Sequence, residues 1–219
     1  MRTHTDIVSR LTNPGIIAVI RTERADDVLH VCEALLAGGV SALEITLTVP
    51  DALKLISEAG RRFGARAVVG AGSVLNAGAG RAALDAGAEF VVSPIVRPEI
   101  AAVARAAGRP VMLGAYTPSE AQAAHEAGAD FVKLFPADTL GPGYIKSLRA
   151  PMPHLRIVPT GGVNLENAAD FFAAGCAALG LGSSLLPGNV IREKNWNELT
   201  RLAAEYVTLA QKSRKPGAG

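Results

Sequence analysis

Lys133 is the residue of this chain whose type and setting most directly suggest chemistry. It interrupts the apolar run 129–136 (ADFVKLFP), which is typical of a strand buried on both faces of a parallel sheet. A buried, unpaired ammonium is costly, and a lysine avoids that cost by losing its proton. A neutral amine in an apolar pocket is the nucleophile that forms a Schiff base with a ketone. The alternative is a lysine on an edge strand, or one that snorkels to solvent.

Glu44 is a second charged residue inside an apolar run, 42–47 (ALEITL). Two opposite charges in two apolar strands predict that the side chains lie near each other. Beside an imine, a carboxylate can act as a general acid and base. The alternative is a carboxylate at a strand end with a purely structural partner.

Two glycine-containing segments follow the last two apolar runs. Thr160, Gly161 and Gly162 come after one run, and Gly182 and Ser183 come after the other. Such loops bind a phosphate through backbone N–H groups, because glycine lets the anion approach closely. Each segment alone could be a tight turn, but together they predict phosphate binding.

Eight apolar runs alternate with helical stretches along the chain. An Ala-Gly pair precedes the second, fourth, sixth and eighth runs and predicts a glycine-terminated helix there. The pattern predicts an α/β fold, a (β/α)8 TIM barrel with an extra N-terminal helix, in one domain over 1–219 with a flexible tail from about 212. An open doubly wound sheet is the alternative, but its glycine-rich dinucleotide turn is missing. The strands are expected near 16–20, 42–47, 67–71, 89–93, 110–114, 130–134, 156–160 and 177–181. Helices are expected near 5–11, 23–36, from Pro50, and near 77–86, 98–107, 118–127, 144–148 and 165–173.

The active face of such a barrel lies at the C-terminal ends of its strands. This rule alone selects residues of several chemical types. They include an amine, a carboxylate, a guanidinium and several hydroxyl groups. The residues are Arg21, Glu44, Thr46, Ser73, Ser93, Pro94, Gly114, Lys133, Phe135, Thr160, Gly161, Gly162, Gly182 and Ser183.

Composition argues against several other classes of protein. The formal net charge is only +2, and no basic cluster precedes the tail, so nucleic acid is not an expected partner. No apolar run reaches membrane length, and the N-terminus lacks the apolar core of a signal peptide. Cys32 and Cys176 lie in apolar contexts, which favours buried thiols and a cytoplasmic location. The four histidines lack metal-ligand spacing, so no metal is expected; they are His4, His30, His125 and His154.

Five motifs, in order along the chain, closely resemble those of the 2-keto-3-deoxy-6-phosphogluconate (KDPG) aldolases. That family also includes 4-hydroxy-2-oxoglutarate (KHG) and phosphogalactonate aldolases. The similarity runs from about Ile7 to Val207. The motifs are 43–46 (LEIT), 70–75 (GAGSVL), 131–137 (FVKLFPA), 159–163 (PTGGV) and 180–183 (GLGS).

The resemblance implies a class I aldolase without metal or cofactor, commonly a homotrimer. It would cleave the phosphorylated keto acid KDPG to pyruvate and glyceraldehyde 3-phosphate. Lys133 would form the Schiff base and Glu44 would shuttle protons. Ser73 and Thr160 would lie near the pyruvate carboxylate, with Phe135 also in the substrate site. The phosphate would be held by Gly161, Gly162, Gly182 and Ser183.

Three residues depart from the family pattern, and two of them, Thr48 and Tyr116, leave the substrate open among KDPG, its galacto epimer and KHG. Thr48 stands where many members have arginine, so Arg21 is assigned the contact with the carboxylate or with Glu44. Ser73 stands where threonine is usual. Tyr116 follows the fifth strand, where Pro-Gly is usual, and is expected to narrow the substrate channel. Two other functions compete: a sugar-phosphate isomerase or synthase with Glu44 as base, and a non-catalytic sugar-phosphate binding barrel.

Overall fold

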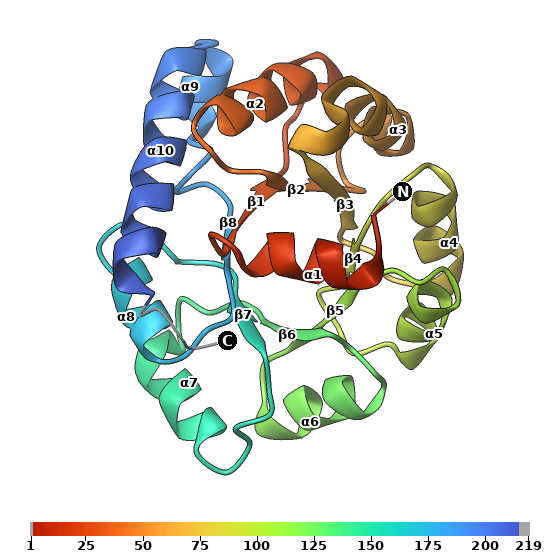
Figure 1. Ribbon diagram of the computed structural model, residues 1–219, viewed down its shortest axis with the longest axis vertical. Helices are drawn as coiled ribbons and strands as arrows, with labels where there is room; N and C mark the ends of the chain where they lie inside the picture. Colours follow the sequence, from red (N-terminus) through yellow and green to blue (C-terminus); the bar gives the residue numbers. More distant parts are fainter. Residues whose placement is uncertain (1, 215–219) are drawn as a thin grey trace.

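The computed structural model describes residues 2–214 and contains an eight-stranded parallel sheet. Its strand order is β7-β6-β5-β4-β3-β2-β1-β8, and a bridge between Thr160 and Gly180 joins β7 to β8. The sheet is thus closed as a barrel (Figure 1), which confirms the predicted fold. The strands are β1 (Ile16–Ile20), β2 (Ala42–Thr46), β3 (Val68–Gly72), β4 (Val91–Val92), β5 (Val111–Ala115), β6 (Phe131–Leu134), β7 (Ile157–Pro159) and β8 (Leu179–Leu181).

Helices surround the barrel and alternate with its strands (Figure 1). One helix begins later than predicted: α3 starts at Ala52, with Asp51 as the residue before it, whereas the sequence predicted a start at Pro50. The short helix α9 was not predicted. The helices are α1 (His4–Thr12), α2 (Ala25–Ala37), α3 (Ala52–Phe63), the 3-10 turn η1 (Gly64–Arg66), α4 (Ala77–Asp85), α5 (Pro98–Ala106), α6 (Pro118–Glu126), α7 (Gly141–Arg149), α8 (Ala168–Ala173), α9 (Gly188–Arg192) and α10 (Trp196–Ser213).

The predicted glycine repeat ends every second helix. Gly39, Gly87, Gly128 and Gly175 follow α2, α4, α6 and α8 with φ between 88° and 101°. This left-handed conformation costs glycine little and terminates a helix before the chain enters the next strand. The first Ala-Gly pair is Ala37-Gly38, but there the residue with left-handed φ is the next glycine, Gly39.

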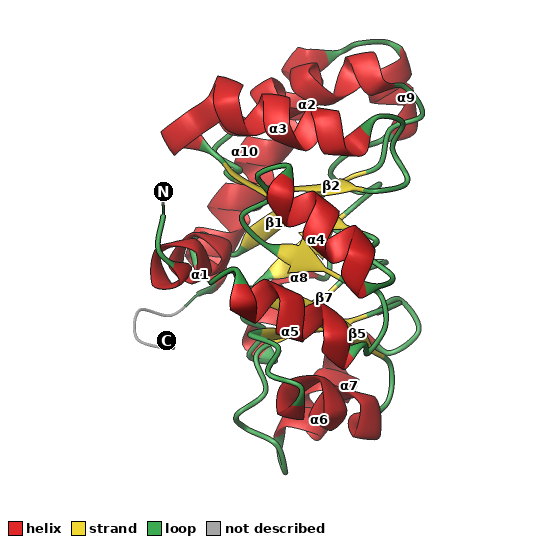
Figure 2. Ribbon diagram, turned by 90° about the vertical axis from the view of Figure 1, so that its right-hand side faces the viewer, coloured by secondary structure: helices red, strands yellow, loops and turns green. Residues whose placement is uncertain are grey.

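The core has two layers, and the inner one fills only one end of the barrel. The inward side chains of that layer include Phe90, Met112 and Phe131, and Ile7 and Leu11 of α1 pack against them. Figure 2 shows α1 lying across this end. An ion pair between His4 Nε2 and Asp130 Oδ1, 2.8 Å apart, holds α1 to the start of β6. The open end is therefore the one at the C-terminal ends of the strands.

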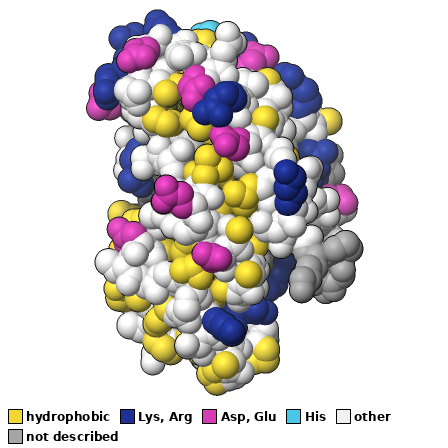
Figure 3. All heavy atoms as spheres, turned by 90° about the vertical axis from the view of Figure 1, so that its left-hand side faces the viewer, with side chains coloured by type: hydrophobic (Ala, Val, Ile, Leu, Met, Phe, Trp, Pro, Cys, Tyr) yellow, Lys and Arg dark blue, Asp and Glu magenta, His cyan; other side chains and the backbone are white. Residues whose placement is uncertain are grey.

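The last helix, α10, packs on the outside of the barrel against α2 and α8 (Figure 1). Thr200 Oγ1 donates a hydrogen bond of 3.0 Å to the Ala34 carbonyl oxygen. The flexible tail was predicted from about 212, but the helix continues to Ser213, and residues 215–219 lie outside the described part. On the face around α10, acidic and basic side chains are interspersed with hydrophobic ones (Figure 3).

Both cysteines are buried free thiols, as the sequence predicted. Burial raises the pKa of Cys32 to about 12 and that of Cys176 to about 12. Within residues 2–214, no helix is long and apolar enough to span a bilayer.

The first prediction concerns Gly70, which faces the barrel interior in β3. A Cβ at this position would collide with the ring of Phe90. Overpacking a core typically costs about 1–3 kcal/mol, so Gly70→Ala should lower the free energy of unfolding by that amount in urea denaturation. Gly143→Ala is the matched control, because a Cβ there meets no atom within 4 Å and alanine favours a helix. Equal stabilities of the two variants would contradict the packing that we describe.

Candidate active site

A cavity of about 780 Å³ lies at the C-terminal ends of the strands. It brings together nine of the ten residues to which the family resemblance gives a role, together with Pro94, and Glu44 is the one of the ten that does not line it. Four apolar lining residues, Val19, Leu75, Val163 and Leu186, were missed because nothing in their type marks them as functional. The predicted residues in its wall are Arg21, Ser73, Lys133, Phe135, Thr160, Gly161, Gly162, Gly182 and Ser183.

Lys133 and Glu44 meet inside the barrel. The alternation of strand residues points both side chains inward, from β6 and from β2. Lys133 Nζ lies 3.5 Å from Glu44 Oε1, and the two side chains are only 8% and 3% exposed. Because β2 and β6 stand four strands apart in an eight-stranded barrel, the pair spans its interior. The predicted proximity is confirmed.

Glu44 Oε1 is buried and accepts no hydrogen bond within the described part of the chain. Its ion pair with Lys133 is long, so most of its hydrogen-bonding capacity is unused. Lys133 Nζ also lies 5.5 Å from the centre of the Phe135 ring. The arrangement presents an amine to the cavity and places a carboxylate oxygen directly behind it, both sheltered from bulk water.

Inward-facing glycines make the space for this pair. A Cβ at Gly72 would collide with Glu44 Oε1, and one at Gly114 would collide with the backbone of Pro94. A Cβ at Gly180 would collide with the Thr160 hydroxyl. These glycines lie on β3, β5 and β8. The absence of a side chain at these positions gives Glu44, the Pro94 backbone and the Thr160 hydroxyl their space in the barrel interior.

Arg21 and Ser73 stand beyond the ends of β1 and β3, on either side of β2. Arg21 lines the cavity and is exposed. Ser73 has a φ of 58°, in the left-handed region that non-glycine residues rarely adopt. Strained backbone of this kind persists where the surrounding structure fixes it, often at functional sites.

The loops after β7 and β8 form the opposite part of the wall. Gly161 and Gly162 have φ values of 90° and 71°. Ser184 Oγ joins the two loops by donating to the Val163 carbonyl oxygen at 2.6 Å. Among residues 2–214, no hydrogen-bond partner is found for the backbone N–H groups of Gly162, Val163, Ser183 and Ser184. Free N–H groups that converge on a cavity are suited to an anion.

Asn167 supports the first of these loops. Its side-chain amide donates to the Gly162 carbonyl oxygen at 2.9 Å, and its Oδ1 accepts from the backbone of Asn164 at 2.9 Å. Sequence reasoning missed both asparagines. Their signal was an Asn-x-x-Asn spacing directly after the glycine pair, which favours local side-chain-to-backbone bonding.

Tyr116 does not narrow the channel as the sequence analysis expected. It is absent from the cavity wall, and its hydroxyl lies 3.0 Å from Thr139 Oγ1 outside the cavity. Tyr144 donates to the Tyr116 carbonyl oxygen at 3.0 Å, and burial raises the pKa of Tyr144. The Tyr116 hydroxyl is paired with Thr139 in the loop after β6, and this partner could not be foreseen from the sequence.

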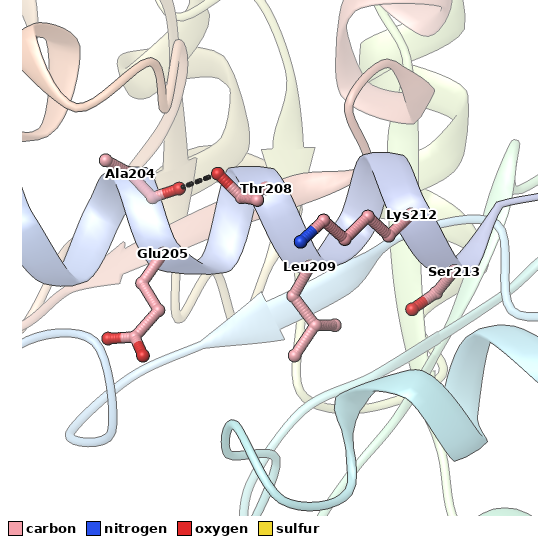
Figure 4. A pocket seen from close by; sticks show the side chains of 6 residues that line it. All are labelled: Ala204, Glu205, Thr208, Leu209, Lys212 and Ser213. Carbon is pink, nitrogen blue, oxygen red and sulfur yellow. Dashed lines mark hydrogen bonds between the residues drawn. The ribbon is translucent and has the colours of Figure 1, made fainter.

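A second hollow, of about 580 Å³, runs along the outer face of α10 (Figure 4). The Thr208 hydroxyl is already bonded to the Ala204 carbonyl oxygen at 2.8 Å. This hollow lies apart from Lys133 and Glu44 and offers no comparable pair of reactive groups. Its lining residues are Ala204, Glu205, Thr208, Leu209, Lys212 and Ser213.

The histidines lie away from the cavity wall. His30 stacks on Trp196, with ring centres 5.6 Å apart, and His125 lies against His154 with ring centres 4.6 Å apart. Over residues 2–214, no three His, Cys, Asp or Glu side chains come together as a set of metal ligands.

Comparison with known proteins assigns this chain to a family. The family model for KDPG and KHG aldolases matches residues 7–202. A probable 2-dehydro-3-deoxy-6-phosphogalactonate aldolase from Rhizobium meliloti is 38% identical over 86% of this chain and 90% of its own length. The 2-dehydro-3-deoxy-phosphogluconate aldolase of Pseudomonas aeruginosa is 37% identical over 88% of this chain and 87% of its own.

A solved structure of a related aldolase also superposes on this chain. It is the KDPG aldolase of Legionella pneumophila with pyruvate captured as a covalent carbinolamine. It superposes with a TM-score of 0.84 at 30% identity and covers 90% of this chain and 96% of its own. Fold, family model and relatives agree over nearly the whole chain, and this chain therefore belongs to the KDPG and KHG aldolase family.

Proposed function

We propose that this protein is a class I aldolase that cleaves KDPG to pyruvate and glyceraldehyde 3-phosphate. The observation that carries the proposal is the buried pair of Lys133 Nζ and Glu44 Oε1, 3.5 Å apart, beside a cavity whose far wall presents free backbone N–H groups. Family membership supports the reaction class. The covalent pyruvate adduct in the Legionella relative supports an amine nucleophile.

In the proposed reaction, Lys133 gives a proton to Glu44 and, now neutral, attacks the C2 ketone to form the carbinolamine. Glu44 returns that proton to the carbinolamine hydroxyl, which leaves as water, so that an iminium ion and the Glu44 carboxylate remain. Glu44 then takes the proton of the C4 hydroxyl. The C3–C4 bond breaks, its electron pair moves into the iminium to give an enamine, and the aldehyde departs. Glu44 returns its proton to C3, and water hydrolyses the new iminium to release pyruvate and Lys133.

The two ends of the substrate would be held by different walls. Arg21 and Ser73, with Thr160, would bind the carboxylate, because a guanidinium and hydroxyl groups suit that anion. The phosphate would lie on the N–H groups of the loops after β7 and β8, including Gly161, Gly162, Gly182 and Ser183. Phe135 would cover the imine.

The galacto epimer of KDPG is a second candidate substrate. The relative named for that activity is 38% identical and the one named for the gluco activity is 37% identical, so similarity does not separate them. The smaller, unphosphorylated KHG is a third candidate. Thr48, which stands where many family members have an arginine, follows the end of β2 but does not line the cavity, so the contacts that such an arginine would make are missing here.

We also propose a homotrimer, located in the cytoplasm. Four exposed hydrophobic residues follow four consecutive strands, β3 to β6, and we call them the apolar rim: Leu75, Ile95, Tyr116 and Phe135; Leu75 and Phe135 also line the cavity. Exposed hydrophobic residues at neighbouring strand ends are typical of a protein interface. The two free thiols favour a reducing compartment.

Replacing Glu44 separates imine formation from cleavage. Glu44→Gln should lower kcat for KDPG cleavage by about 10²–10⁴-fold, as is usual when a general acid–base group is lost. Pyruvate with borohydride should still modify Lys133 in this variant, as mass spectrometry of the digested protein would show. Lys133→Met is the control and should not be modified. Near-normal turnover of Glu44→Gln, or an adduct on Lys54 or Lys146 instead, would reject the mechanism.

Gly182 tests the phosphate site without disturbing the fold. A Cβ at this position meets no protein atom within 4 Å and projects beside the cavity. Gly162 is a poorer choice, because a Cβ there collides with Asp138. Gly182→Ala should raise KM for the cleavable phosphorylated epimer at least tenfold and hardly alter KHG cleavage.

The panel for that experiment contains KDPG, its galacto epimer and KHG, assayed for pyruvate release with wild type and Gly182→Ala. The epimer with the higher wild-type kcat/KM identifies the substrate. Equal losses on phosphorylated and unphosphorylated substrates would place the phosphate elsewhere.

Placing a charged residue in the apolar rim tests whether the rim is a subunit interface. Ile95→Asp should convert a trimer to a monomer in sedimentation equilibrium, because a buried carboxylate without a partner is costly. Leu53→Asp is the matched control: Leu53 is about as exposed, 40% against 39%, but lies on α3 away from the rim. A wild-type monomer, or an Ile95→Asp trimer, would refute the proposed interface.

A further inference from the structure

The end of β2 is bonded to both neighbouring strands at the residues that precede Arg21 and Ser73. Thr46 Oγ1 lies 3.2 Å from the Ile20 carbonyl oxygen, and this hydrogen bond is buried. On the other side, the Leu47 backbone N–H donates to the Gly72 carbonyl oxygen at 2.8 Å. One strand end therefore sets the separation of the two neighbouring strand ends.

Thr48 completes a chain of hydroxyl groups. Its Oγ1 lies 2.9 Å from Thr46 Oγ1. A carbonyl oxygen can only accept, so Thr46 must donate its proton to Ile20. Thr46 then accepts from Thr48, whose hydroxyl is the donor. Thr46 is fully buried, so an unsatisfied hydroxyl oxygen there would be costly.

The hydrogen bonds of Thr46 and Thr48 affect Arg21 through the backbone. The Ile20 carbonyl and the Arg21 N–H belong to one planar peptide group, so fixing the carbonyl fixes where the Arg21 side chain begins. Two acidic residues that follow Arg21, namely Asp26 and Asp27, pair with Arg24, and within the described part of the chain no ion pair of Arg21 is found. Its placement at the cavity therefore depends on its backbone.

We propose that Thr46 and Thr48 are positioning residues, which orient Arg21 toward the substrate carboxylate without touching the substrate. The inference rests on the proposed function, because it assumes that Arg21 binds the carboxylate. Neither threonine lines the cavity. Both carry out this task only as a pair, since Thr48 holds the hydroxyl of Thr46 in its donating orientation.

Threonine-to-valine changes test the pair, because they remove the hydroxyl and keep the shape. Thr48→Val should raise KM for the cleavable substrate about three- to tenfold, the loss expected for one neutral hydrogen bond, and leave kcat nearly unchanged. Thr46→Val should have a larger effect on KM. Thr48→Ser, which keeps the donor, should restore the wild-type KM. Thr208→Val on α10 is the matched control, and it should change nothing.

A double-mutant cycle with Arg21→Ala distinguishes positioning from direct contact. If Thr48 acts through Arg21, Thr48→Val should have no further effect on KM in the Arg21→Ala background, because the two changes are coupled. Additive losses would overturn the inference and indicate direct contact or a general effect on the fold. A fall in kcat with loss of the borohydride adduct would also overturn it, since that places the effect at Lys133.

Failure of the proposed function would look different. A wild-type protein that releases no pyruvate from any member of the substrate panel refutes the aldolase assignment and, with it, the role given to Arg21. A wild type that cleaves, combined with an additive cycle, refutes only the positioning role. Thr48 lies in the turn after β2 and its side chain is exposed, so Thr48→Val keeps the test valid should Thr46→Val fail to fold.

Discussion

The ion pair of Lys133 and Glu44 is the constraint on which the rest of the structure depends. Two charges this deeply buried lose their hydration, and their mutual attraction compensates only when the geometry is well defined. The barrel supplies that geometry by bringing the two side chains inward from strands on opposite sides. Glycines at the upper inward positions leave room for them. The pair is thus held by the closed sheet and not by a network of polar neighbours.

The barrel divides its interior between stability and chemistry. At the N-terminal ends of the strands, large side chains such as Phe90 and Phe131 fill the space, and α1 covers them. At the C-terminal ends, inward positions on β3, β5 and β8 are glycines and the interior is open. Residues near the closed end can therefore secure folding while the open end carries buried charge and strained backbone, as at Ser73.

Much of this was predictable from the sequence, and the exceptions have physical causes. Strands and helices followed from apolar runs and glycine caps, because those signals are local. The pairing of Lys133 with Glu44 followed from the cost of buried charge. Tyr116 was misplaced because the direction of a loop side chain depends on its partner, here Thr139. The hydrogen bonds of Thr46 and Thr48 could not be predicted from the sequence either, because Thr46 donates to the carbonyl of Ile20, which is 26 residues away along the chain.

Glu44 Oε1, which within the described part of the chain has only its long ion pair with Lys133 Nζ, determines where the C4 hydroxyl of the substrate would bind in the proposed reaction. A buried carboxylate oxygen that accepts no hydrogen bond is under-satisfied in the free protein. In the proposed reaction, the C4 hydroxyl of the bound substrate would supply the missing donor, and this is the proton that must leave. Arg21 at one end and the phosphate loops at the other would hold the substrate by groups remote from the breaking bond. Their binding energy would then bring C2 to Lys133 and the C4 hydroxyl to Glu44 together, which is how remote contacts accelerate a reaction.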